Sequence, residues 1–209
     1  MIIYKLLYFI PLLFFFCVEP NSNISSQFPV EPLNSFLPAS AGIYWVYEED
    51  YTDADTHSVR LDTTFITGTE VKNGEQWYLL ENRNCFATNI LSDRFMLKKD
   101  SVFSRQYNWN IPVTALIFPK PGKDITQYNM LTGGDTDIKF KAVFSDRTVF
   151  TRLGKYKGYA YYYHEGPEET ITYKIVPGIG IVEKRQEGRS FTGQREYLWK
   201  CSLVDIHIP

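Results

Sequence analysis

Apolar residues recur at every second position after Pro38, and this spacing is the feature that most limits the fold of the chain. A period of two places successive side chains on opposite faces of a strand, so that one face is buried. Because no segment in this region keeps a helical period over three turns, we predict an all-β domain with at most one short helix. The clearest runs are Ile43/Trp45/Tyr47, Ile138/Phe140/Ala142/Phe144, Tyr159/Tyr161/Tyr163 and Ile171/Tyr173/Ile175.

Turn-forming residues separate these runs at intervals of roughly 8–15 residues, which is typical of antiparallel sheets. Asn73-Gly74 is the best hairpin turn, since both central residues of a type I′ turn need positive φ. Pro177 is expected to end a strand, and Gly178 and Gly180 to supply permissive backbone after it. The stretch Pro119 to Asp135 has little strand character and is predicted to be a long loop. The predicted architecture is one or more antiparallel sheets, shaped as a half-barrel or a sandwich.

The first residues have a different character. Lys5 precedes an apolar run from Leu6 to Phe16, which is shorter than the roughly 20 residues that a membrane-spanning helix needs. A basic residue followed by such a run predicts a secretory signal. Cys17 follows directly and resembles the lipobox cysteine of bacterial lipoproteins, whose thiol is acylated, although Phe16 stands where Gly, Ala or Ser is usual. An ordinary export signal or an uncut anchor are the alternatives.

These features divide the chain into three predicted parts. Residues 1–17 are a signal segment with a lipidation cysteine, and residues 18–38 are a Pro-, Asn- and Ser-rich tether. Residues 39–209 form the β-rich domain. The predicted location is the cell envelope, in the periplasm or at the outer-membrane surface, with the membrane as a partner through the lipid anchor.

Segments of the domain resemble a loosely defined group of bacterial exported proteins and lipoproteins, most of them uncharacterised. The resemblance rests on the first strand, Gly42-Ile43-Tyr44-Trp45-Val46-Tyr47, and on a closing hairpin. That hairpin contains Arg152 to Tyr161 and then Ile175-Val176-Pro177-Gly178-Ile179-Gly180-Ile181. The resemblance implies a β-rich envelope domain and brings no catalytic residue or cofactor with it.

Few residues suggest catalysis or metal binding. The three histidines, His57, His164 and His207, stand far apart, and no His or Cys pair has metal-ligand spacing. The acidic stretch from Glu48 to Asp55 is predicted to be a solvated hairpin loop. Motifs of serine hydrolases and phosphate-binding loops are absent. We therefore predict no catalytic, cofactor or metal site.

Charge and aromatic content indicate the kind of partner. Without Lys5 the chain has 21 basic and 24 acidic residues, which argues against nucleic acid. The aromatic content is 16%, and adjacent residues such as Tyr161 and Tyr162 must point to opposite faces of a strand. An exposed aromatic face would bind an apolar, glycan or protein ligand, and the alternative is that both faces of the sheet are covered, as in a sandwich or a half-barrel wrapped on itself.

We therefore expect a non-catalytic binding or structural lipoprotein. Two alternatives remain. One is a hydrolase-like enzyme whose groups converge from distant strands, such as His164, Glu165 and the acidic stretch. The other is an assembly partner that pairs through a strand edge.

Two cysteines remain in the domain, Cys85 and Cys201. Cys201 shares a predicted strand face with Trp199 and Leu203, and Cys85 is expected to begin a strand after the turn that ends at Asn84. A disulfide requires their Cα atoms to lie within roughly 7 Å of each other. The alternative is two buried thiols that act as small hydrophobic groups.

Overall fold

The computed structural model describes residues 37–81, 85, 93–99, 101–108, 111–120, 128–131, 137–143, 148–165, 169–189 and 196–209. All regular structure in these residues is β-strand, which confirms the predicted all-β class. It follows that the described part of the chain contains no apolar helix able to cross a bilayer. Cys17 and the predicted tether up to residue 36 lie outside the described residues.

The described residues form fourteen strands, numbered in chain order. They are β1 (Tyr44–Thr52), β2 (His57–Lys72), β3 (Glu75–Glu81), β4 (Arg94–Lys98), β5 (Ser101–Asn108), β6 (Ile111–Phe118), β7 (Tyr128–Leu131), β8 (Asp137–Val143), β9 (Thr148–Thr151), β10 (Gly154–Lys157), β11 (Tyr159–Glu165), β12 (Glu169–Val176), β13 (Gly180–Arg189) and β14 (Glu196–His207).

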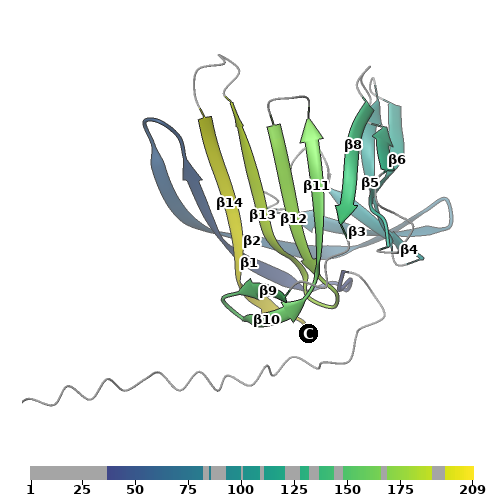
Figure 1. The fold of residues 1–209 in the computed structure, drawn as a ribbon. Coiled ribbons are helices and arrows are strands. Elements are labelled where there is room, and N and C mark those ends of the chain that lie inside the picture. Colours follow the sequence, from purple (N-terminus) through teal and green to yellow (C-terminus); the bar gives the residue numbers. More distant parts are fainter. Residues whose placement is uncertain are drawn as a thin grey trace, which may run out of the picture.

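Twelve of these strands form one antiparallel sheet, in the order β6-β5-β4-β3-β2-β1-β14-β13-β12-β11-β8-β7. The order contains two meanders, one running from β1 out to β6 and the other from β7 in to β14. They are joined where the first strand pairs with the last, from Tyr44↔His207 to Thr52↔Leu198. The outer strands β6 and β7 also contact each other, so the sheet curls into a nearly closed barrel (Figure 1).

The barrel has two different ends (Figure 1). At the upper end in this view β1 turns into β2, β11 and β13 finish, and β12 and β14 begin. At the lower end lie the turn between β12 and β13, the C-terminus and the small separate sheet of β9 and β10. The first described residue, Leu37, lies at this lower end, where it is buried beside Gly180 at the start of β13.

Large aromatic side chains fill the interior. Phe118 makes edge contacts with Tyr161 and Tyr173, with ring centroids 5.1 and 5.3 Å apart. Trp45 and Tyr47 are buried rings whose polar atoms donate to backbone carbonyls, which offsets the cost of burying a donor. Trp45 Nε1 donates to Ile179 O at 2.7 Å, and Tyr47 Oη donates to Ile181 O at 2.7 Å. The predicted core positions Trp45, Ile171, Tyr173 and Ile175 are all buried.

The predicted turns are present. Asn73 and Gly74 both have positive φ, 53° and 77°, in the tight hairpin between β2 and β3. β12 ends at Val176, directly before Pro177, and β13 begins at Gly180, whose φ is 103°. A side chain at position 180 would also press on the indole of Trp45. Glycine is therefore required there by both the backbone and the packing.

Four sequence-based predictions need comment. The predicted loop from Pro119 to Asp135 contains the short strand β7, which is held by pairing with β8 rather than by a strong pattern of its own. Most of the predicted acidic loop is strand, since β1 extends to Thr52 and only residues 53–56 form the turn. Cys85 lies in a turn and does not begin a strand. The predicted core position Phe140 lies in β8, but its side chain is outside the described residues.

Candidate functional site

A belt of polar and aromatic side chains lies inside the upper half of the barrel. We call it the interior polar belt, and it consists of Glu49, Asp62, Glu169, Lys184, Gln186, Tyr197 and Trp199. Strand register brings these residues together across β12, β13, β14, β1 and β2. Lys184 is opposite Tyr173 on one side and Cys201 on the other, and Gln186 is opposite Ile171 and Trp199. All of these positions face the interior, because Lys184, Tyr173 and Cys201 are fully buried.

Lys184 is the central residue of this belt and is 0% exposed. Its Nζ atom lies 3.6 Å from the ring centroid of Trp199, a cation–π geometry. Burial lowers the pKa of Lys184 to about 7, although the negative charges of Glu49 and Glu169 act in the opposite direction. The desolvation of the ammonium group therefore outweighs the attraction of the two carboxylates.

Glu49 connects the belt to the outside. It is 6% exposed, and its two carboxylate oxygens accept hydrogen bonds from Arg60 Nε and Nη2, each at 2.9 Å. This bidentate geometry is the strongest arrangement of an arginine and a carboxylate. Arg60 reaches solvent, with 62% of its side chain exposed. The pair thus compensates a buried carboxylate with a partly hydrated cation.

A second polar group lies nearer the upper rim. Tyr197 Oη donates to Glu169 Oε1 at 3.0 Å, and Gln186 Nε2 donates both to Glu169 and to Tyr197 Oη. The ring of Tyr197 lies over Gly188, where a Cβ atom would come within 3.0 Å of it. Glu169, Gln186 and Tyr197 therefore form a hydrogen-bonded network. The indole N–H of Trp199 and the amide oxygen of Gln186 are buried and have no hydrogen-bond partner among the described residues.

The two domain cysteines form the floor of this belt. Cys85 and Cys201 are joined as a disulfide, with Cα atoms 5.6 Å apart, and both are fully buried. Cys201 is opposite Glu49 and Lys184 in the sheet. The backbone N–H of Cys85 donates to Asp62 Oδ2 at 3.4 Å. Burial raises the pKa of Asp62, while this hydrogen bond lowers it.

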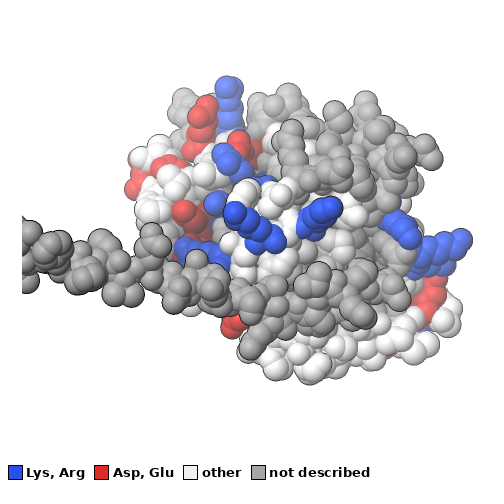
Figure 2. Space-filling model, turned by 60° about the horizontal axis from the view of Figure 1, so that its bottom comes forward, with Lys and Arg blue, Asp and Glu red and all other residues white. Residues whose placement is uncertain are grey.

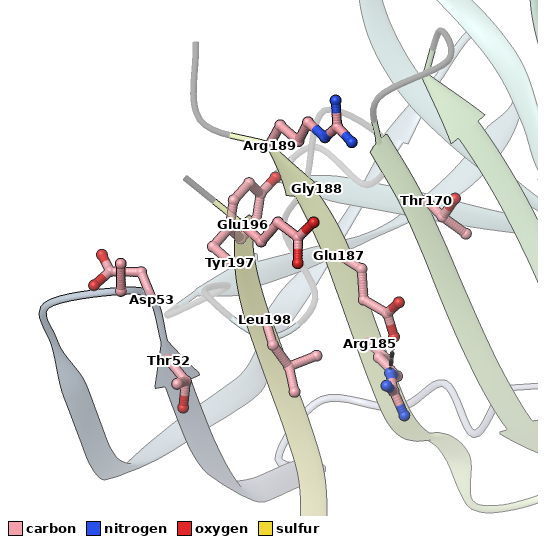
Figure 3. A pocket seen from close by; sticks show the side chains of 11 residues that line it. Thr52, Asp53, Thr170, Arg185, Glu187, Gly188, Arg189, Glu196, Tyr197 and Leu198 are labelled. Atoms are coloured by element: carbon pink, nitrogen blue, oxygen red, sulfur yellow. Dashed lines mark hydrogen bonds and ion pairs between the residues drawn. The ribbon is translucent and has the colours of Figure 1, made fainter. Parts of the chain in front are cut away.

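An open recess lies on the outer face of the same strands. This open cleft, of about 820 Å³, is shown in Figure 3. Its floor is one row of the sheet, Thr52, Leu198, Glu187 and Thr170, which are direct neighbours on β1, β14, β13 and β12. The remaining lining residues are Asp53, Ala54, Arg185, Gly188, Arg189, Glu196 and Tyr197. Arg185 and Glu187 form an ion pair within it.

A smaller recess of about 150 Å³ lies between the ends of β2–β3 and the strands β4–β6. Arg94 forms ion pairs there with Glu70 and with Asp93, the latter at 2.8 Å. These hydrogen bonds raise the pKa of Arg94. Because the polar groups already satisfy one another, this recess is a structural contact between strands.

The two histidines with described side chains, His57 and His207, lie at opposite ends of the β1 pairings and do not come together. His57 Nε2 lies 3.1 Å from Asp50 at the surface, and the His207 ring stacks on Tyr44 with centroids 5.1 Å apart. The side chains of His164 and Glu165 lie outside the described residues. Among the residues described, no group of three His, Cys, Asp or Glu side chains is placed to hold a metal ion.

The burial of Glu49 and Lys184 was not predicted from the sequence, which places Glu49 in a solvated acidic loop. β13 is polar on both faces, with Glu183, Arg185 and Glu187 alternating with Lys184 and Gln186. An alternation of polar with polar residues gives no signal of which set is buried. The register with Tyr173 and Cys201 provides that information.

No family model matches the chain, and no curated protein matches it either. Two solved structures are similar in shape. A candidate lipoprotein from Parabacteroides distasonis is 14% identical, with 83% of this chain and 99% of that chain covered and a TM-score of 0.44. A candidate exported protein with a YmcC-like fold from Bacteroides fragilis is 12% identical, with 84% and 100% covered and a TM-score of 0.43.

Proposed function

We propose that this protein is an exported, lipid-anchored and non-catalytic domain of the bacterial cell envelope, which binds a neutral glycan in the outer cleft at its upper end. Export and anchoring are supported by Lys5, the apolar run up to Phe16 and the cysteine at position 17. The described domain begins with Leu37 at the lower end of the barrel, while the cleft lies toward the upper end. An anchor at Cys17 would therefore join the described domain at the end opposite the cleft.

The chemistry of the cleft favours a neutral polar ligand. Its charges are of both signs, with Asp53, Glu187 and Glu196 beside Arg185 and Arg189. Such a mixture matches neither a purely anionic nor a purely cationic ligand. Sugar hydroxyl groups can donate to the carboxylates and accept from the guanidinium groups. This mixed lining of carboxylates and guanidinium groups is the observation that carries the glycan proposal.

Export and anchoring are tested in cells. Wild-type protein should fractionate with membranes, begin at Cys17 and incorporate labelled fatty acid. The variant Cys17→Ser should lose the label. A cytoplasmic protein that begins at Met1 would contradict export, and an unlabelled wild-type protein would contradict the lipid anchor.

Glycan binding is tested with a glycan array, followed by calorimetric titration of the best neutral oligosaccharide. The variant Thr170→Trp should fill the cleft and weaken binding at least tenfold. Thr172→Trp is the matched control, because Thr172 lies on the same face of β12 but outside the cleft. An array without binding, or an equal effect of both variants, would contradict the proposal.

A further inference from the structure

The hairpin of β9 and β10 presents a cationic face with an exposed aromatic ring. Residues alternate along it, so that Val149 is buried against the barrel while Phe150 points outward and is 68% exposed. In this hairpin Phe150 is directly opposite Lys155, and Thr148 is opposite Lys157. Phe150, Lys155 and Lys157 therefore lie on one face, which we call the hairpin face.

Charge on this face is of one sign. The ten residues from Thr148 to Lys157 contain three basic residues and no acidic one. Arg152 forms an ion pair with Glu48 on the barrel wall, at 2.5 Å. Lys155 Nζ lies 5.4 Å from the ring centroid of Phe150. Figure 2, which brings the lower end forward, shows several Lys and Arg side chains gathered in the middle of this view.

The hairpin lies at the lower end of the barrel (Figure 1), the end at which Leu37, the first described residue, is buried beside Gly180. Position 17 is twenty residues before Leu37. Twenty residues span at most about 66–72 Å, at 3.3–3.6 Å per residue. A membrane that held Cys17 would therefore be within easy reach of the hairpin face, and the tether would keep the local concentration of this face near the membrane high.

We propose that the hairpin face docks on an anionic lipid surface, with Phe150 entering the interface and Lys155 and Lys157 binding lipid phosphates. The proposal rests on the lipid anchoring proposed above. A basic patch would add to the lipid anchor a second, electrostatic contact with an anionic membrane surface. The overall net charge of the chain does not reveal this patch, because the hairpin itself contains no acidic residue. Docking would also fix the cleft end away from the membrane.

The test uses the mature protein purified from membranes and reconstituted into vesicles that contain brominated phosphatidylcholine, with or without phosphatidylglycerol. Flotation first measures anchoring. Bromine then quenches the fluorescence of a tryptophan placed by Phe150→Trp. The matched control is Val59→Trp, since Val59 is 54% exposed and lies near the upper end, opposite Asp50.

The quenching of each variant is measured relative to wild type, which has four tryptophans of its own. In vesicles with phosphatidylglycerol, we expect this increase in quenching to be at least twofold larger for Phe150→Trp than for Val59→Trp. Adding Lys155→Gln and Lys157→Gln, or raising the salt to about 0.5 M, should remove this difference, because screening weakens exposed charge pairs. Flotation with equal quenching at both positions would overturn docking while leaving the anchor intact. A protein that does not float would overturn the anchor and the docking that depends on it.

Discussion

Lys184 shows how a charged side chain can be placed inside a β-barrel. Its aliphatic stem adds apolar surface to the core, and its ammonium group lies over the ring of Trp199. Glu49 and Glu169 contribute favourable but insufficient charge, since the pKa of Lys184 falls to about 7. The residue is therefore an internal cost to stability that depends on pH.

This dependence can be measured with the variant Lys184→Met. Between about pH 7 and the unfolded value near 10.4 the unfolded state binds more protons than the folded state, so wild-type stability rises with pH in this window. Lys184→Met removes the group and should be at least as stable as wild type at pH 7. Its advantage should then shrink by up to about 1.4 kcal/mol per pH unit.

Urea unfolding of both proteins at pH 7, 8 and 9 gives the difference directly. Because all other titrating groups are common to the two proteins, their contributions largely cancel. A difference that stays constant with pH would show that Lys184 is not the titrating group.

At the scale of elements, the small β9–β10 sheet is held on the barrel by close packing at Gly158, between β10 and β11. A Cβ atom at this position would lie 2.8 Å from Ile175 O and 2.8 Å from a methyl group of Val149. Gly158→Ala should therefore push the hairpin away from β12 and destabilise the domain by about 1–3 kcal/mol, as overpacking typically does.

The control is Gly68→Ala, because a Cβ atom at Gly68 meets nothing within 4 Å. We expect its effect to stay within about 0.5 kcal/mol. Chemical denaturation of both variants compares the two sites. Equal free energies of unfolding for the two variants would mean that the hairpin is not tightly packed against β12.

The strands and turns could be predicted from the sequence to the extent that one face is apolar and the other polar. Ile171 and Tyr173 alternate with polar residues in β12, and the structure buries both. Glu49 departs from this pattern, because it is a charged residue whose burial depends on the hydrogen bonds from Arg60 in the next strand. Leu131 and its neighbours in β7 form a strand because β8 lies beside them. Local pattern cannot reveal partners that are supplied by another part of the chain.

At the scale of the whole molecule, the pairing of β1 with β14 joins the two meanders and determines the shape of the barrel. This contact links residues far apart in sequence, so no local signal predicts it. In the sheet, only β1 and β2 separate β14 from β3. Cys201 in β14 can therefore pair with Cys85, which follows β3 in the chain. The upper cleft and the interior polar belt depend on the same pairing of β1 with β14.

The disulfide between Cys85 and Cys201 links the two meanders covalently. We predict that this disulfide is formed in the mature protein. The two residues are separated by 116 positions, and their Cα atoms are 5.6 Å apart, within the range that disulfides require. We expect peptides that contain Cys85 and Cys201 to remain unlabelled by maleimide when the mature protein is denatured without reductant.

In the chain-entropy model, closing so long a loop stabilises the folded domain by about 4–5 kcal/mol. Reductant should therefore lower the denaturation midpoint of wild type, and it should leave the Cys85→Ala/Cys201→Ala double variant unchanged. Labelling of both cysteines in unreduced protein would show that they are buried thiols, and the barrel would then be closed by hydrogen bonds and packing alone.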